Sequence, residues 1–129
     1  MKIMERGNKM DLELQLKTAM KMISLSGDGR CQIQTALNYM MEGKIDAAAD
    51  ELNKANELIK EAHIIQTQVI QKAMAKENKE SAELLFAHAQ DTLMTINSEY
   101  NTAVQMMAMY QLLNARLCRL EDALFEKDK

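Results

Sequence analysis

The chain has 129 residues, 47% of them hydrophobic and 27% charged, and its net charge of −3 is ordinary for a single soluble domain. Acidic residues outnumber the scattered lysines and arginines, and three tyrosines and two phenylalanines are the only aromatic residues. Neither a phosphate-tracking basic patch nor a base-stacking platform is present, so we expect no nucleic acid partner.

The cysteines and the apolar runs limit the cellular setting. Cys31 and Cys118 are far apart and show no ligand-like spacing, which argues against a disulfide framework and against a zinc site. The stretch Met1–Arg6 lacks the apolar core of a signal peptide, and no run approaches the ~18 apolar residues of a membrane span. We therefore expect a reduced, cytoplasmic protein without membrane insertion.

Helix formers dominate a sequence with no proline and four glycines, which predicts an all-α protein. We expect one domain over residues 1–129, with a flexible arm over residues 1 to about 9 and Asp11 as a helix cap. Helices are predicted over about 10–42, 44–76 and 80–126, and Gly43 suits a helix C-terminus. Three long helices with short connections predict an up-down-up antiparallel bundle.

The first predicted helix contains Ser26-Gly27-Asp28-Gly29-Arg30, which by composition would be a loop. The apolar period continues in register across this stretch, which favours one helix in which the glycines allow close approach of a neighbouring backbone or ligand. Asp28 and Arg30 are expected to form an ordinary surface pair.

The second predicted helix has the clearest apolar seam, with spacings of three and four residues throughout. Its members are Ile45, Ala48, Leu52, Ala55, Ile59, Ala62, Gln66, Val69 and Ala73. Gln66 is the only polar member and would need a hydrogen-bond partner if buried. His63 lies one turn before it, and we expect the two side chains to support each other.

The third predicted helix places His88 and Asp91 three residues apart on one face, beside an apolar seam that includes Leu93 and Tyr110. Leu113, Leu117, Leu120 and Leu124 extend the seam. One three-helix subunit cannot bury so many apolar residues, so we expect self-association with cyclic symmetry. The twelve methionines are interpreted as adaptable core residues rather than as a binding surface.

Three motifs, in this order and spacing, resemble those of one known family. The run His88-Ala89-Gln90-Asp91-Thr92-Leu93-Met94-Thr95 is similar to the HAQDHLMT signature of the lactose/cellobiose-type enzyme IIA proteins of the bacterial sugar phosphotransferase system. Residues 62–67, AHIIQT, resemble that family's AHxxQT segment, and residues 26–30 resemble its AGDAR or SGxAR segment. The resemblance covers roughly residues 13 to 110.

The resemblance implies a homotrimer of three-helix subunits that carries phosphate for disaccharide uptake. His88 would accept a phosphoryl group from the phosphocarrier protein HPr and pass it to a cysteine of enzyme IIB. Asp91 would lie at the trimer axis, where three carboxylates repel one another unless a cation or protons join them. A hard, oxygen-preferring divalent cation such as magnesium or calcium fits best, and we expect Mg²⁺. The chain departs from the family at Thr92, which replaces a second histidine, at Gly29, which replaces a common alanine, and in its longer third helix.

Residue chemistry agrees with such a carrier. A neutral imidazole is a competent nucleophile near pH 7, and Gln90, Thr92, Gln66 and His63 are candidate supports for the phosphate. The sequence has no glycine-rich nucleotide loop, so the phosphate would come from a protein donor.

The main alternative is a non-catalytic helical oligomerisation or adaptor protein, with His88 as an interface residue and Asp91 paired to a lysine. A di-iron bundle is disfavoured because paired Glu-x-x-His motifs are missing. The sequence does not choose among lactose, cellobiose and chitobiose-like sugars.

Overall fold

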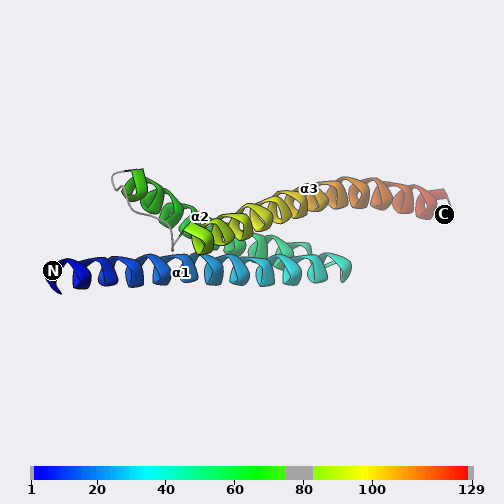
Figure 1. Cartoon of the computed structure of the whole chain (residues 1–129). Coiled ribbons are helices and arrows are strands. Elements are labelled where there is room, and N and C mark those ends of the chain that lie inside the picture. The colour runs from blue at the N-terminus through cyan, green and yellow to red at the C-terminus, as the bar shows by residue number, and fades with distance from the viewer. Residues whose placement is uncertain (1, 75–82, 128–129) are drawn as a thin grey trace.

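The computed structural model describes residues 2–74 and 83–127, with side chains from 12 to 72 and from 84 to 126. It contains α1 (Lys2–Met41), α2 (Ile45–Met74) and α3 (Glu83–Lys127), and these residues include no strand. α2 returns beside α1, and α3 again runs in the direction of α1 (Figure 1). The all-α, up-down-up arrangement predicted from the sequence is confirmed, whereas the predicted second turn lies outside the described residues.

α1 begins at Lys2, although the sequence predicts a flexible arm up to about residue 9. Lysine, methionine, glutamate and arginine are good helix formers, and the single Gly7 costs only about 1 kcal/mol, so the helix extends through this stretch. Asp11, the expected cap, consequently lies inside α1.

α1 also continues without a break through Ser26–Arg30, as the apolar period predicts. Gly29 is buried, and a Cβ there would lie 3.5 Å from Ile59 Cγ1 on α2 and 3.8 Å from Ile96 Cγ2 on α3. These are ordinary van der Waals separations, so Gly29 faces both neighbouring helices, but the close approach expected of these glycines does not require glycine at this position. Gly27 approaches no neighbouring helix within the chain, because it is exposed and a Cβ there would meet nothing within 4 Å.

The first turn is closed by Gly43, which adopts a positive φ of 78°. The Gly43 amide donates to the Met40 carbonyl at 3.0 Å, and the Lys44 amide donates to the Tyr39 carbonyl at 2.8 Å. These two bonds satisfy the last carbonyls of α1 in the pattern of a Schellman cap. The predicted helix end at Gly43 is thus explained by a conformation that glycine adopts without strain.

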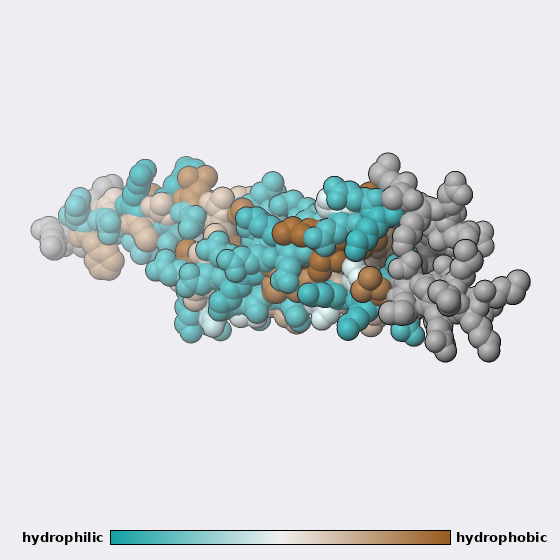
Figure 2. All heavy atoms as spheres, turned by 90° about the vertical axis from the view of Figure 1, so that its left-hand side faces the viewer, coloured by the Kyte–Doolittle hydropathy of each residue, from teal (hydrophilic) through white to brown (hydrophobic). Residues whose placement is uncertain are grey.

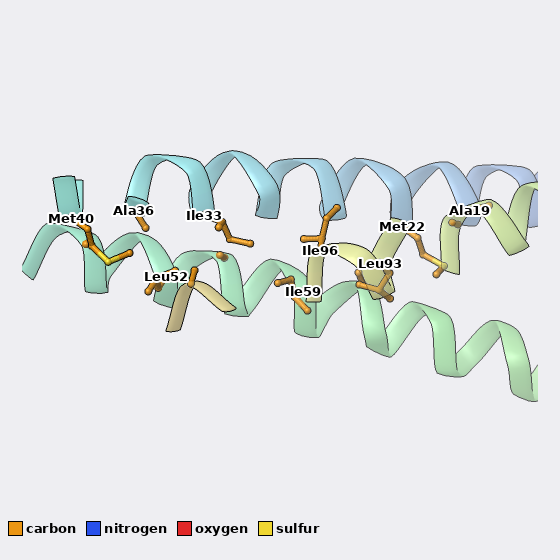
Figure 3. Close-up of a cluster of buried hydrophobic side chains, with 14 residues drawn as sticks. Ala19, Met22, Ile33, Ala36, Met40, Leu52, Ile59, Leu93 and Ile96 are labelled. Carbon is orange, nitrogen blue, oxygen red and sulfur yellow. The ribbon is translucent and has the colours of Figure 1, made fainter. Parts of the chain in front are cut away.

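The core lies along the line where the three helices meet, and half of its members are alanines. The buried hydrophobic residues are Ala19, Met22, Ile33, Ala36 and Met40 of α1, Ala48, Leu52, Ala55, Ile59 and Ala62 of α2, and Ala89, Leu93, Ile96 and Ala103 of α3 (Figure 3). Five consecutive seam positions predicted for the second helix are among them. Small side chains at these positions let the helices pack closely.

Two pairs of facing residues show the register of the parallel pair α1 and α3. A Cβ built on Gly29 would lie 3.8 Å from Ile96 Cγ2, and a Cβ built on Gly43 would lie 3.7 Å from the Tyr110 hydroxyl. Both pairs are separated by the same number of residues along the chain, so the helices advance together over this length. Beyond Tyr110, α3 extends past the end of α1 (Figure 1), and its described side chains from 111 to 126 are all exposed.

Exposed apolar side chains occur both scattered among hydrophilic residues and in one regular set on α3. On the face shown in Figure 2, hydrophilic residues cover most of the surface and hydrophobic residues show between them. Leu113, Leu117, Leu120 and Leu124 of α3 form a more regular exposed set. The surplus apolar seam predicted from the sequence is present in the folded chain.

Candidate functional site

His88 and Asp91 lie one helical turn apart on α3, and both are exposed. The opposite side of this segment is anchored, because Ala89, Leu93 and Ile96 are buried against α1 and α2. A rigid helix thus presents an imidazole and a carboxylate to solvent on neighbouring positions. The shared polar face predicted from the sequence is confirmed.

Two threonines of the same segment direct their hydroxyl groups to the helix backbone. Thr92 Oγ1 donates to the His88 carbonyl at 2.9 Å, and Thr95 Oγ1 donates to the Asp91 carbonyl at 2.8 Å. Such bonds to the carbonyl four residues earlier are common for threonine in helices. Within the chain, the hydroxyl proton of Thr92 is therefore used in a hydrogen bond to the His88 carbonyl.

On α2, His63 and Gln66 contact each other as the sequence predicts. His63 Nδ1 and Gln66 Oε1 are 3.2 Å apart, and both residues are partly buried. Since an amide oxygen only accepts, Nδ1 is the donor in this bond, which leaves Nε2 as the acceptor nitrogen of a neutral ring. The bond does not use the two N–H donors of the Gln66 amide group.

Helix geometry places the His63–Gln66 pair of α2 and the His88–Asp91 pair of α3 at a similar height along the bundle. From the layer of Ile59 and Ile96, Gln66 is about 10 Å farther along α2 and His88 about 12 Å back along α3. Because α2 and α3 run in opposite directions, both displacements point the same way (Figure 1). In the part of the chain that the structure describes, however, no side-chain hydrogen bond joins His88 to either α2 residue.

A charged contact near this site differs from the prediction. Arg30 pairs with Glu99 of α3 rather than with Asp28, through Nε to Oε2 at 3.0 Å and Nη2 to Oε1 at 2.8 Å. The hydrogen bonds and the charge of Glu99 raise the pKa of Arg30 above its ordinary value. Asp28 is close to Arg30 in sequence, but two residues apart on a helix are not neighbours, whereas Glu99 lies across the parallel α1–α3 pair.

Ser26 is a buried polar residue that the sequence does not single out. Its side chain is fully buried, and its Oγ has no hydrogen-bond partner among the described residues. A buried hydroxyl without a partner opposes folding by about 1–3 kcal/mol. The only sequence signal is its place beside the glycines of the first motif.

Metal-ligand clusters, cysteines and membrane-spanning helices were also considered for the single chain. The described residues contain no cluster of three or more histidine, cysteine or acidic side chains that would hold a metal ion. Cys31 and Cys118 are free and exposed. None of the helices in residues 2–74 and 83–127 combines the length and apolar content needed to cross a membrane.

Comparison with known proteins agrees with this arrangement. The sequence model of the family described as "PTS system, Lactose/Cellobiose specific IIA subunit", where PTS denotes the phosphotransferase system, matches residues 17–111. The N,N'-diacetylchitobiose-specific EIIA component of Escherichia coli strain K12 is 29% identical over 99 residues, covering 77% of this chain and 84% of that protein.

Two solved structures share the fold over the same portion of the chain. They are PtcA from S. mutans and the PTS cellobiose-specific enzyme IIA from Bacillus anthracis, each 33% identical with a TM-score of 0.69. Each comparison covers 77% of this chain, with 95% of the first and 90% of the second. The family match spans all three motifs, at residues 26–30, 62–67 and 88–95. The chain therefore belongs to the lactose/cellobiose-specific IIA family and is a phosphotransferase component with a phosphocarrier role in sugar uptake.

Proposed function

We propose that His88 is the residue that carries the phosphoryl group, receiving it from phosphorylated HPr and passing it to a cysteine of enzyme IIB. The observation that carries the proposal is the exposed imidazole of His88, held beside Asp91 on a helix whose opposite face is buried. A carrier must meet two different proteins in turn, so an exposed nucleophile on a rigid element suits it better than one in a closed pocket.

The chemistry needs few groups besides the imidazole. In the first step a ring nitrogen of neutral His88 attacks phosphorus, and the bond between phosphorus and HPr breaks. No proton has to leave the attacking nitrogen. In the second step the phosphorus–nitrogen bond breaks as a thiolate of enzyme IIB forms a phosphorus–sulfur bond, so the phosphoryl group is only relayed. The protein supplies in-line positioning and charge stabilisation.

Donors for the phosphate oxygens are proposed at Gln90, Thr92, Gln66 and His63. Gln66 is the best prepared of these, because its carbonyl oxygen is occupied by His63 and its NH₂ group remains for an anion. Gln90 is partly buried on the helix that carries His88. Thr92 would have to release the His88 carbonyl in order to donate to phosphate, so it is the weakest of the four.

A homotrimer around α3 is proposed as the working assembly, with Asp91 at its axis. One chain brings a single exposed carboxylate at this position, too few ligands for a hard cation that prefers six or more oxygens. Three chains would bring three carboxylates, which fit Mg²⁺ with water completing its shell. When bound, the ion would neutralise the carboxylates and hold the subunits together, while the phosphoryl transfer itself would use His88.

The test is phosphorylation with phosphoenolpyruvate, enzyme I and HPr. The parent protein is expected to gain one acid-labile phosphoryl group per chain. His88→Gln should abolish the label with helix content unchanged, whereas His63→Gln should keep at least part of it because His63 acts through Gln66. A label that survives in His88→Gln and disappears in His63→Gln would reverse the assignment.

Assembly and metal are tested separately. Light scattering should give the mass of three chains, and chelator should lower the melting temperature of the parent but not of Asp91→Asn. A monomeric mass would remove the axial site, and an equal chelator response of the two proteins would remove the ion. A trimer that never accepts phosphate would instead favour a non-catalytic helical adaptor, the interpretation that Thr92 in place of the family's second histidine supports.

The sugar and the location follow from the same role. The relatives' names point to disaccharides such as N,N'-diacetylchitobiose and cellobiose, and we propose that this chain serves a disaccharide of that class. A carrier between HPr and enzyme IIB would act in the cytoplasm.

A further inference from the structure

A strip on the solvent side of α1 is not explained by the packing of the chain itself. Its members are Met20, Ile23 and Gly27, and we call it the Met20–Gly27 strip. Gly27 is exposed and a Cβ there would meet nothing within 4 Å, although glycine is among the least favourable residues in a helix interior. Met20 is apolar and yet 56% exposed. These residues therefore suit a contact with a molecule outside the chain.

The strip lies on the same side of the bundle as His88. The ion pair between Arg30 of α1 and Glu99 of α3 marks the solvent edge between these two helices. His88 lies eleven residues, about three turns, before Glu99, so it points within about 20° of the same direction around α3. Gly27 is turned about 60° outward from Arg30 around α1, since Ser26 on the inner side is buried.

The strip also begins at the height of His88. Gly29 of α1 faces Ile96 of α3, and the two helices run in the same direction (Figure 1). With the same offset, Met20 lies within about 2 Å of the level of His88, and Gly27 lies about 9 Å farther along the bundle. Around α1, Met20 and Gly27 point within about 20° of each other. A molecule that reaches the His88 ring from solvent therefore meets the strip at the same time.

We propose that the Met20–Gly27 strip is the docking surface for phosphorylated HPr. The proposal rests on the proposed function, in which His88 takes the phosphoryl group from this protein. For that step the phosphorus atom must come within about 3–3.5 Å of a ring nitrogen of His88. A protein interface buries about 800 Å² per partner, a patch roughly 30 Å across, so a donor centred on His88 also covers the strip.

The accessibility of His88 argues against a second copy of this chain as the occupant. A copy that stayed on the strip would lie over the His88 ring as well and would keep the donor from it, whereas a transient partner leaves the ring free between encounters. The absent side chain of Gly27 lets the HPr backbone approach α1 closely. The flexible thioether of Met20 adapts to an apolar patch beside the phosphorylated group of HPr.

Steady-state labelling with phosphorylated HPr as the varied substrate tests this surface. Gly27→Gln and Met20→Gln should each raise KM for phosphorylated HPr by about fivefold or more, with kcat changed by less than about twofold, because docking contacts are made in the bound state and the transition state alike. Lys21→Gln is the matched control, since Lys21 is exposed near the level of His88 but points about 180° away from Arg30 around α1. A KM for Gly27→Gln within about twofold of the parent, or an equal rise for Lys21→Gln, would overturn the proposal.

Stability and mass distinguish docking from a structural effect. Gly27→Gln should melt no lower than the parent, because glutamine forms helices better than glycine and the added side chain has room. Gly29→Ala, which changes a buried glycine of the same helix, should leave KM unchanged. A lower mass of Gly27→Gln in light scattering would instead assign the strip to a contact between copies of the chain, and this result would also overturn the proposal.

Binding of unphosphorylated HPr separates this inference from the proposed function. Titration calorimetry should show weaker binding for Gly27→Gln and Met20→Gln than for the parent, while His88→Gln should still bind HPr although it accepts no phosphate. If no protein is ever labelled but only the strip variants lose HPr binding, the carrier role of His88 is rejected and the docking surface stands. Normal labelling with equal HPr binding in all variants would reject the docking surface alone. A parent that neither binds HPr nor becomes labelled would overturn both.

Discussion

Replacement of Gly29 by alanine should stabilise the protein, because the structure has room for the added methyl group. The new Cβ would lie 3.5 Å from Ile59 Cγ1, 3.8 Å from the Ala55 carbonyl oxygen and 3.8 Å from Ile96 Cγ2. These are ordinary van der Waals separations. Alanine in a helix interior is favoured over glycine by about 1 kcal/mol, and a buried methyl group adds about 0.8 kcal/mol. The unfolding free energy should therefore rise by about 1–2 kcal/mol.

The measurement is urea unfolding monitored by circular dichroism, at one fixed protein concentration because association also affects stability. Gly27→Ala is the matched control, since its Cβ meets nothing within 4 Å and should gain only the helix propensity of about 1 kcal/mol. A loss of stability in Gly29→Ala, with a gain in Gly27→Ala, would refute the argument. It would mean that α1 lies closer to α2 and α3 than these distances indicate.

Three further predictions test the packing of the helices. Ser26→Ala should raise the free energy of unfolding by about 1 kcal/mol, because it removes a buried hydroxyl without a partner, and a clear loss in urea unfolding would show that the hydroxyl is bonded. Removing either Arg30 or Glu99 should cost about 0.5–1 kcal/mol, less at high salt, since the pair is 47% and 39% exposed; a double-mutant cycle with no coupling energy would contradict this. Leu93→Ala should cost about 2–5 kcal/mol by calorimetry, whereas exposed Met94→Ala should change stability by less than about 0.5 kcal/mol, so similar losses in both would argue against the assigned faces.

The sequence by itself determined the helices and their inner faces. Helix formers without proline, together with spacings of three and four residues, are local properties, so α2 and its buried seam from Ala48 to Ala62 follow from them directly. The end of α1 at Gly43 is predictable for the same reason, because a positive φ favours glycine. The spacing of His88 and Asp91 likewise puts the imidazole and the carboxylate on one face, because residues three apart are neighbours on any helix.

Only the tertiary structure decided which groups meet across helices. The pairing of Arg30 with Glu99 depends on the register between α1 and α3. The apolar spacing within each helix does not tell how far one helix is shifted along the other. The isolation of the Ser26 hydroxyl and the different surroundings of Gly27 and Gly29 follow from the same register. The start of α1 at Lys2 could not be placed from the sequence either, because one unfavourable glycine weighs little against a run of helix formers. Differences in helix propensity of about 1 kcal/mol per residue determine where the helices form. Close packing of side chains determines which residues of different helices become neighbours.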